Sequence, residues 1–590
     1  MSEETIYKKV WHILTPAQHK KTLLLFVLMV LGMLLEMLGL SLVIPVLAII
    51  SQSDLAYQYP FLKPLLQYLG NPSTYELVIF SLLILALVYT IKALFLGFLA
   101  WQQAKFSFAV SASISQRLFN NYLRHPYTFH LQHNSAQLIQ NVANEASIFN
   151  NVTQSALIIL TDGLIFIGIT ALLLFIEPIG ALFVITILGM SGWVFYKFTR
   201  KLIHSWGEAR KFHEGLRMKH LQQGLGGAKD VKLLGRETEF LDQFRTHNFS
   251  SAKVGELQTT VRALPRYWLE LLAVLGLLTL MLVMIKLGKP MDSLVPMLGL
   301  FAAAAFRVMP SINRVLSAFQ GLRYALPVIE MLYKELHLIP AFNNTERQVP
   351  LTVNNSIELK NISFFYPACE APTINNISIS IPCGSMTGFI GTTGAGKTTL
   401  VDIILGLLTP TSGAVSVDNI NIQTNIRGWQ DQIGYVAQSI FLTDDTLRRN
   451  VAFGLSNEKI NETAVWKAIR AAQLESFVNE LPQGLDTVVG ERGIRLSGGQ
   501  RQRIGIARAL YHDPQVLVMD EATSFLDTET ERGVMDAVNS MHGSKTILII
   551  THRLSTVENC DQLYCLEKGV VVDEGSPNSI LFGNETISSS

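Results

Sequence analysis

A chain of 590 residues is too long for one hydrophobic core, so we expect two to four domains. Hydrophobic residues make up 49% of the chain and charged residues only 16%, against roughly 25% in soluble domains, which indicates a membrane protein. The 47 basic and 46 acidic residues nearly cancel, which argues against a nucleic-acid partner. The four cysteines show no CxxC spacing, so we expect reduced thiols and no cysteine-bound metal.

Six apolar stretches are each long enough to cross a hydrocarbon core of ~30 Å as a helix. They cover residues 22–50, 76–101, 154–176, 179–198, 264–286 and 293–316. The first has no small-residue cleavage site behind a short apolar core, so we interpret it as a retained membrane helix rather than a signal peptide. The segments that follow the second and fourth stretches are long, polar and helix-prone, which predicts helical extensions outside the membrane.

Basic residues favour one orientation in the membrane. Lys8, Lys9, Lys20 and Lys21 precede the first stretch, and the loop after the fourth is rich in lysine and arginine, so the N-terminus and both long loops are expected in the cytoplasm. An even number of helices then places the C-terminal domain there too. Between the first two stretches, the apolar residues 61–69 fit a helix lying in the outer interface or an apolar loop equally well.

The pattern changes from Leu351 onward. Short β-type runs at 356–365, 385–390, 515–519 and 545–550 alternate with helical stretches, which predicts an α/β fold with a mainly parallel sheet. We therefore expect a multi-domain membrane protein: an all-α domain of six transmembrane helices at 1–336, a linker at 337–350 and an α/β domain at 351–590.

Two motifs in the α/β domain predict an ATP site. GTTGAGKT at Gly391–Thr398 lies between a strand-like and a helix-like segment, as a phosphate-binding loop does. In such a loop, backbone N–H groups surround the phosphates, Lys397 reaches the terminal phosphates and Thr398 ligates magnesium. VLVMDE ends a buried strand in Asp520 and Glu521, which are suited to holding magnesium and polarising a water. The expected cofactors are ATP and Mg²⁺.

LSGGQ at Leu496–Gln500, followed by RQRIGIARAL, resembles the signature sequence of ATP-binding cassette (ABC) proteins. Tyr366 resembles the family's adenine-stacking aromatic and Gln438 its Q-loop glutamine. His552 resembles the switch histidine, and Asp527 ends a segment that resembles the D-loop, although Phe525 stands where the family usually has alanine.

The resemblance implies roles for individual residues of this chain. It implies Glu521, His552 and Gln438 as catalytic residues, and Thr398, Gln438 and Asp520 as metal-binding residues. It implies nucleotide contacts from Tyr366, Gly391, Thr392, Thr393, Gly394, Ala395, Gly396, Lys397, Thr398, Thr399, Leu496, Ser497, Gly498, Gly499, Gln500 and Asp527. In the family each ATP lies between the phosphate loop of one subunit and the signature of the other, so a chain with one of each implies a homodimer.

Cations inside the apolar stretches are candidates for substrate binding. At 1.5 Å per residue from the outer helix ends, Lys92, Arg266 and Arg307 lie at depths of ~22–30 Å, and Arg314 lies one or two turns beyond. Such a group suits a phosphorylated headgroup, because guanidinium pairs bidentately with phosphate oxygens. Internal salt bridges to Glu36, Asp162 or Glu270 are the alternative, and extension of the cations to the membrane surface is a third reading.

The membrane domain carries a second resemblance. LEMLGLSLVIPVL, RALPRYWLE and FRVMPSINRV resemble segments of the bacterial lipid-linked oligosaccharide flippases. This implies ATP-driven flipping of a polyprenyl-pyrophosphate-linked oligosaccharide from the cytoplasmic to the outer leaflet of the bacterial inner membrane. Two alternatives stay open: a broader lipid, polysaccharide or multidrug exporter, and a cassette protein that regulates a partner without transport. The sequence does not identify the glycan or the polyprenol.

Overall fold

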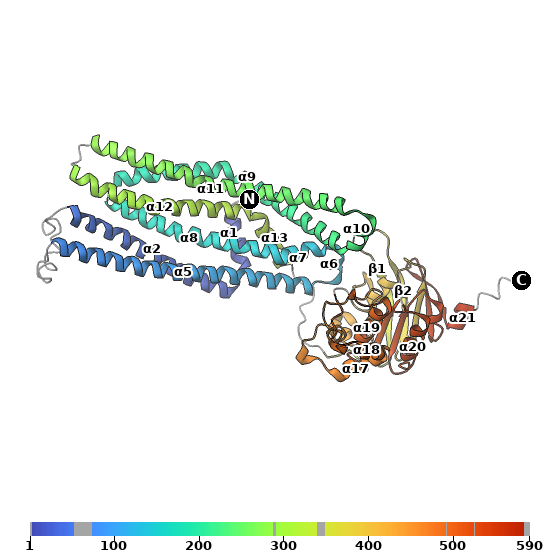
Figure 1. The fold of residues 1–590 in the computed structure, drawn as a ribbon. Helices are drawn as coiled ribbons and strands as arrows, with labels where there is room; N and C mark the ends of the chain where they lie inside the picture. Colours follow the sequence, from blue (N-terminus) through green and yellow to red (C-terminus); the bar gives the residue numbers. More distant parts are fainter. Residues whose placement is uncertain are drawn as a thin grey trace. The chain divides into compact units, whose positions relative to one another are not determined.

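The computed structural model describes residues 3–51, 74–176, 178–286, 291–338, 349–367, 369–490, 493–523 and 526–582. It divides into two compact units, which are described one at a time (Figure 1). The helical unit comprises Met1–His125 and His130–Ala341, and the α/β unit comprises Pro126–Phe129 and Phe342–Ser590.

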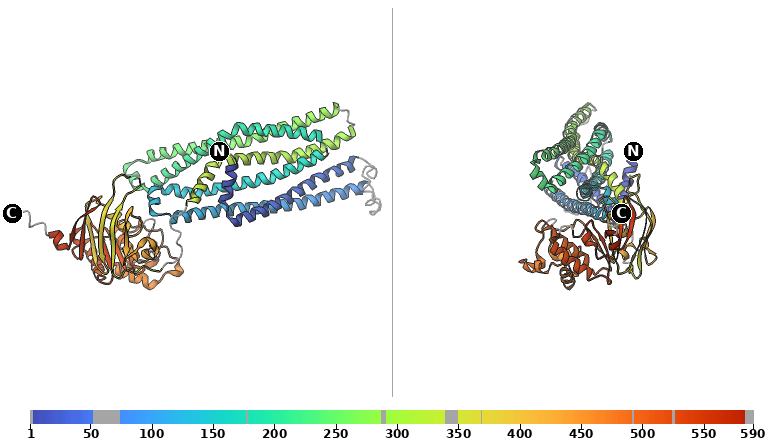
Figure 2. Two further views of the ribbon diagram at one scale, coloured as in Figure 1. Left: turned by 180° about the vertical axis from the view of Figure 1, so that it is seen from behind. Right: turned by 90° about the vertical axis from the view of Figure 1, so that its right-hand side faces the viewer.

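Long helices that run side by side dominate the helical unit, as both views of Figure 2 show. In its described part the helices that exceed 30 residues are α2 (Pro16–Ser51), α5 (Thr74–Arg124), α8 (Ala146–Ile176), α9 (Pro178–Gly226), α11 (Glu237–Lys286) and α12 (Met291–Tyr324). The shorter described helices are α1 (Glu3–Ile13), α7 (Ser135–Gln140), the π-helical turn Asn141–Glu145, α10 (Ala228–Leu234) and α13 (Leu326–His337). Helix α6 (Tyr127–Gln132) is divided between the two units, with Tyr127–Phe129 in the α/β unit. Each predicted apolar stretch lies within one long helix.

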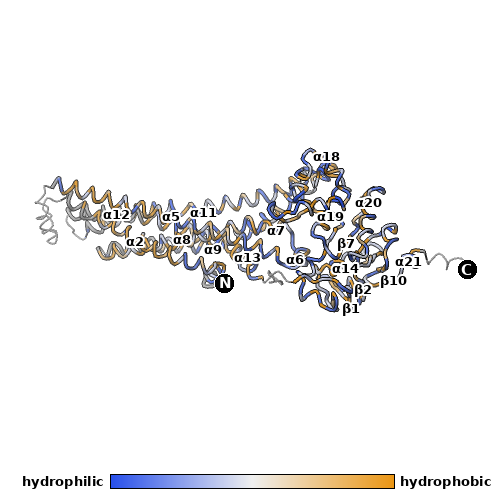
Figure 3. The backbone as a smooth tube through the Cα atoms, turned by 90° about the horizontal axis from the view of Figure 1, so that it is seen from below, coloured by the Kyte–Doolittle hydropathy of each residue, from blue (hydrophilic) through white to orange (hydrophobic). Residues whose placement is uncertain are grey.

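Hydropathy along these helices indicates a bilayer as their solvent (Figure 3). Among the described residues, three segments are long and apolar enough to cross a membrane: Pro16–Val43, Tyr75–Arg124 and Ser135–Phe175. Large apolar side chains such as Leu23, Phe80 and Leu94 are more than half exposed, which suits lipid far better than water. The apolar ends of α9, α11 and α12 include side chains outside the described set, and so do residues 61–69, whose two readings stay open.

The described part of the α/β unit contains two sheets. A six-stranded sheet has the order β10-β9-β3-β8-β7-β6, parallel except for β10 at one edge. Its strands are β3 (Met386–Gly391), β6 (Ile433–Val436), β7 (Val516–Asp520), β8 (Thr546–Ile550), β9 (Gln562–Glu567) and β10 (Val570–Gly575). The central strands β7 and β8 are buried along their whole length, as their continuous apolar runs require.

The second sheet was not predicted. It is antiparallel, with the order β2-β1-β4-β5, and consists of β1 (Ser356–Phe364), β2 (Ile374–Pro382), β4 (Ser412–Val417) and β5 (Ile420–Asn421). The run at 356–365 therefore belongs to this sheet and not to the parallel one. Burial in β1 and β2 largely alternates, the pattern of a sheet with one covered face.

Short helices pack around the sheets. The α-helices are α14 (Lys397–Ile404), α15 (Ile426–Gln430), α16 (Leu447–Val451), α17 (Glu462–Ala471), α18 (Glu475–Glu480), α19 (Gly498–Leu510), α20 (Thr528–Asn539) and α21 (Pro577–Phe582). The phosphate loop connects β3 to α14, and the acidic pair lies at the end of β7. Both motifs thus stand at carboxyl ends of parallel strands, where open α/β sheets bind ligands.

Candidate ATP site and membrane charges

The phosphate loop has the backbone that a phosphate cradle needs. Gly391, Gly394 and Gly396 have φ angles of 152°, 84° and 100°, which side chains rarely allow. A Cβ atom at Gly391 would lie 2.2 Å from the Leu566 carbonyl oxygen, so the loop depends on glycine for space as well as conformation. Lys397 opens α14, and its Nζ donates to the carbonyl oxygens of Gly391 and Thr392 at 2.8 and 3.0 Å. The residues of this loop therefore fit a bound nucleoside triphosphate.

The rest of the loop divides by exposure. Thr392, Thr393 and Thr398 are exposed, whereas Ala395 and Thr399 are buried. Tyr366, predicted to stack on adenine, lies next to the loop, and its hydroxyl is 3.1 Å from Thr399 Oγ1. The Tyr366 ring packs edge-on against Phe364 of β1, which fixes its position. The antiparallel sheet thus supplies one wall of the candidate nucleotide site.

The three predicted catalytic side chains meet at the end of β7. Gln438 Nε2 donates to Glu521 Oε2 at 2.7 Å, and His552 Nδ1 lies 3.1 Å from Glu521 Oε1. Glu521 itself has φ of +46°, a left-handed conformation that is uncommon for a residue with a side chain. A carboxylate held between an amide and an imidazole can orient and polarise a water molecule.

The neighbouring acid Asp520 is only 3% exposed. Burial and the charge of Glu521 raise the pKa of Asp520 above its usual value. Asp402 on α14 is likewise buried, and desolvation with the nearby charge of Asp520 raises the pKa of Asp402 to about 6. A cluster of desolvated carboxylates of this kind favours a divalent cation, because a cation restores the charged forms. The donor set fits Mg²⁺, with Asp520 and the Thr398 hydroxyl as the protein oxygens.

The signature segment forms an exposed helix N-terminus. Ser497 caps α19: its Oγ accepts from Gln500 N at 3.2 Å, while Gln500 Oε1 accepts from Ser497 N at 2.8 Å. Leu496, Gly498 and Gly499 flank this cap, and the backbone N–H groups at the start of α19 suit an anion. Asp527 caps α20 with a single bond, its Oδ1 accepting from Thr530 N at 3.0 Å. Ser524 and Phe525 lie outside the described residues.

One residue of this site was missed. Gln502, 1% exposed on α19, donates from Nε2 to the backbone oxygen of Glu521 at 3.1 Å, which ties the signature helix to the catalytic strand end. The polar residue in RQRIGIARAL, two positions past the signature on an otherwise apolar face, was the available signal. Nothing in the spacing alone predicts its partner.

In the helical unit, cations pair with the acids considered as alternatives. Arg314 makes two hydrogen bonds to Asp162, from Nε at 2.8 Å and from Nη2 at 2.6 Å, and Ser311 Oγ donates to the same carboxylate at 3.0 Å. Lys92 Nζ lies 3.4 Å from Glu36 Oε2 and 3.9 Å from the centre of the Tyr89 ring. Glu36 also lies within electrostatic reach of Arg314, so these two pairs form one cluster.

The other two cations lie elsewhere or are not described. Arg266 Nε contacts Glu270 at 3.0 Å on the exposed face of α11, with 67% of the Arg266 side chain accessible. The side chain of Arg307 is outside the described residues. The structure therefore brings Lys92 and Arg314 together and leaves Arg266 on a different surface.

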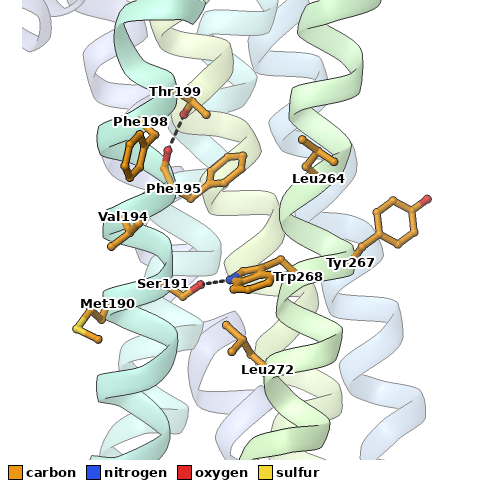
Figure 4. Close-up of a pocket in the computed structure, with 10 residues that line it drawn as sticks. All are labelled: Met190, Ser191, Val194, Phe195, Phe198, Thr199, Leu264, Tyr267, Trp268 and Leu272. Atoms are coloured by element: carbon orange, nitrogen blue, oxygen red, sulfur yellow. Dashed lines mark hydrogen bonds between the residues drawn. The ribbon is translucent and has the colours of Figure 1, made fainter.

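An apolar groove of about 790 Å³ runs between α9 and α11 (Figure 4). Phe198 and Val194 line it from α9, and Leu264 and Trp268 from α11. Trp268 Nε1 donates to Ser191 Oγ at 2.9 Å, which satisfies the indole N–H within an otherwise apolar lining. Such a lining suits hydrocarbon chains.

Comparison with known proteins identifies the family. Residues 374–524 match the ABC transporter family, and residues 18–286 match the ABC transporter transmembrane region. An ATP-dependent lipid A-core flippase of Saccharophagus degradans is 31% identical over 481 residues, 80% of each chain. The chain is an ABC exporter half-transporter.

Further relatives cover more of this exporter. An ATP-dependent lipid A-core flippase of Vibrio vulnificus is 27% identical over 554 residues, 92% of this chain and 93% of that protein. The structure of a bacterial Atm1-family ABC exporter with ATP bound has the same fold, with a TM-score of 0.77, 21% identity and coverage of 95% and 96% of the two chains. The exporter is an ATP-hydrolysing transporter with transmembrane helices.

Proposed function

We propose that this exporter flips a polyprenyl-pyrophosphate-linked oligosaccharide from the cytoplasmic to the outer leaflet of the bacterial inner membrane, as a homodimer driven by ATP and Mg²⁺. The observation that carries the proposal is that one chain combines all the motifs of an ABC ATP site with a lipid-exposed helical unit whose interior holds cations. The N-terminus and the α/β unit are assigned to the cytoplasm by the positive-inside rule.

In the proposed mechanism, Glu521 polarises the attacking water while Gln438 and His552 hold its carboxylate. Lys397 and the glycine-rich loop would hold the phosphates of ATP, and Asp520 and the Thr398 hydroxyl would hold Mg²⁺, which would supply positive charge beside them. Ser497 of the partner subunit would close the site, because the exposed N-terminus of α19 offers backbone N–H groups to the γ-phosphate.

For the substrate, we assign Lys92 and Arg307 to phosphate contacts and Arg314 to a structural role. Arg266, predicted as a third phosphate contact, is exposed and paired with Glu270, so we leave it out of this site. Arg314 is held by two hydrogen bonds on a carboxylate to which Ser311 also donates, whereas Lys92 has one ion-pair contact, with Glu36 at 3.4 Å, beside its cation–π contact with Tyr89 at 3.9 Å. A phosphate can displace the single, longer contact more readily than the bidentate one.

A second candidate has specific support. The relatives named above are lipid A-core flippases, so a phosphorylated glycolipid of the lipid A type is the competing substrate. Both candidates carry a phosphorylated glycan on hydrocarbon chains, and the apolar groove between α9 and α11 is compatible with either. If the chain were instead a multidrug exporter, its substrate would not need to carry a glycan.

The deciding experiment measures transfer of labelled headgroups across proteoliposome membranes with each glycolipid in turn. We expect ATP-dependent transfer of the polyprenyl-pyrophosphate-linked oligosaccharide, and a Lys92→Gln/Arg307→Gln variant that keeps basal ATP hydrolysis but loses most transfer. Lys253→Gln, on the exposed part of α11, is the matched control. Faster transfer of the lipid A-type substrate would replace the first candidate by the second.

A further inference from the structure

A polar cavity of about 330 Å³ lies within the helical unit, separate from the cations discussed above. Side chains of α8, α9, α11 and α12 line it. Its polar lining on α8 consists of Asn151, Gln154 and Ser155, and Gln258 of α11 adds another amide. The volume lies at the lower end of the ~300–1,000 Å³ range of small-molecule sites.

The charges around the cavity cancel. Arg210 and Glu214 line it from α9 and Arg262 from α11, while Glu145 lies behind Arg210. Arg210 pairs with Glu214 at 2.6 Å and with Glu145 at 3.2 Å, so two cations face two anions. A neutral site of this kind gives a free phosphate no net attraction, but it offers donors and acceptors to a hydroxyl-rich molecule.

One buried donor at this cavity has no acceptor. Arg210 is 4% exposed, and its Nε–H makes no hydrogen bond within the part of the chain that the structure describes. A buried unsatisfied donor is costly, so a ligand hydroxyl or carbonyl that accepts from it would be favoured. The three amide side chains can each donate and accept, which matches the dual character of sugar hydroxyls.

Glycines keep the cavity open and its walls close. A Cβ atom at Gly321 of α12 would lie 3.0 Å from Ser155 Oγ, and one at Gly207 of α9 would lie 2.3 Å from the Tyr324 carbonyl oxygen. The first glycine preserves space beside Ser155. The second lets α9 approach α12 and so helps to form the wall that carries Arg210.

The cavity lies beyond the hydrocarbon core on the proposed cytoplasmic side. Counted from the outer helix ends, Ser155, Arg262 and Arg210 lie ~32, ~36 and ~48 Å along their helices, past a core of ~30 Å. Ser155 and Arg262 thus lie at the level of the inner-leaflet headgroups, ~5–7 Å deep, whereas Arg210 lies farther toward the cytoplasm.

We propose that this cavity binds a neutral sugar residue of the glycan headgroup as the lipid enters from the cytoplasmic leaflet. The inference rests on the proposed function for its biological role, but sugar binding itself can be tested apart from transport. The amides and Arg262 hydrogen-bond the hydroxyls, and Arg210 Nε donates to one of them.

The test is saturation-transfer NMR on the full-length exporter in nanodiscs, with glucose, galactose, N-acetylglucosamine and N-acetylgalactosamine as separate probes and inorganic phosphate as a fifth. We expect saturation transfer to at least one sugar and no competition by phosphate. Gln258→Leu with Arg262→Gln should weaken that sugar's binding at least tenfold, since the first change removes an amide and the second removes the guanidinium donors and shortens the side chain. Thr259→Val, one position along α11 on an exposed site outside the lining, removes a hydroxyl elsewhere and should leave sugar binding unchanged.

Every outcome of this test supports or contradicts sugar binding in the cavity. The inference is overturned by the absence of transfer to all four sugars, by equal binding in a Gln258→Leu/Arg262→Gln variant with an unchanged melting curve, or by competition from phosphate. If that variant unfolds, Gln154→Leu replaces it under the same expectation. Headgroup transfer without sugar binding would remove the cavity assignment and keep the proposed function, whereas sugar binding without glycolipid transfer would do the reverse.

Discussion

The α/β unit and the helical unit place their charged residues by different rules. In the α/β unit, Lys397, Asp520 and Glu521 lie at or just after the ends of strands, so the carboxyl edge of one sheet gathers them. In the helical unit, Lys92 meets Glu36 across 56 positions and Arg314 meets Asp162 across 152. In the first arrangement each residue is placed by its own short motif at a strand end, even though Gln438 and Glu521 stand 83 positions apart, whereas the second depends on which helices become neighbours.

The largest expected effect is the loss of ATP hydrolysis caused by a single substitution in the α/β unit. Glu521→Gln should lower the rate of ATP hydrolysis by about a hundredfold or more, because a positioned base contributes ~10²–10⁴ to such reactions. Affinity for ATP should change little, as the amide keeps the shape of the site. Glu529→Gln, exposed in the first turn of α20, is the control and should hydrolyse ATP normally. Normal turnover in the Glu521→Gln protein would contradict the assignment.

A second experiment tests whether each ATP site needs residues from two subunits. Lys397→Ala and Ser497→Arg chains should each be inactive, but mixed dimers place both lesions in one site and leave the other intact. Random mixing should then restore about a quarter of wild-type ATP hydrolysis if the two sites are independent. A mixture that stays as inactive as its components would argue against shared sites.

Within the helical unit, the pair of Arg314 and Asp162 should act on stability. Arg314→Gln leaves a buried carboxylate with Ser311 as its remaining described donor, and should lower the free energy of unfolding by about 1–3 kcal/mol after allowance for the exposure of Arg314. Asp162→Asn in the same chain should recover much of the loss, as a double-mutant cycle on melting curves would show. Unchanged melting with impaired transfer would instead place Arg314 among the substrate contacts.

The smallest effect concerns pH and the ATP site. The pKa of Asp402 is about 6 in the folded unit and lower in the unfolded chain, so the folded state binds the extra proton. The contribution of protonated Asp402 to the free energy of unfolding is therefore fully present below pH ~4 and is lost as the pH rises through about 6. Asp402→Asn should therefore stabilise the unit at pH 7.5 by about 1–2 kcal/mol, allowing for partial solvent screening, and make little difference at pH 4. Equal effects at both pH values would contradict the assignment.

This difference between the two units also explains which features could be predicted from the sequence. The phosphate loop at Gly391–Thr398 and the acidic pair could be predicted from the sequence, because each is a contiguous motif that follows a strand and so lies at a sheet edge. Hydropathy gave the long helices. The antiparallel sheet was missed although β2 alternates over nine residues, because β4 and β5 are short and the pairing of β1 with β2 and β4 is not written in local spacing. The choice between phosphate contacts and ion pairs stayed open for the same reason: local spacing does not show which helices become neighbours.

The account's central claim is that ATP hydrolysis in the α/β unit drives headgroup transfer through the helical unit. It is tested most directly by measuring both rates on the same proteoliposomes, for the wild-type exporter and for Glu521→Gln, with a labelled polyprenyl-pyrophosphate-linked oligosaccharide. We predict transfer that starts on addition of ATP in the wild type and falls together with hydrolysis in the variant. Transfer that persists when hydrolysis stops, or active hydrolysis in the wild type with no transfer of this lipid, would contradict the claim.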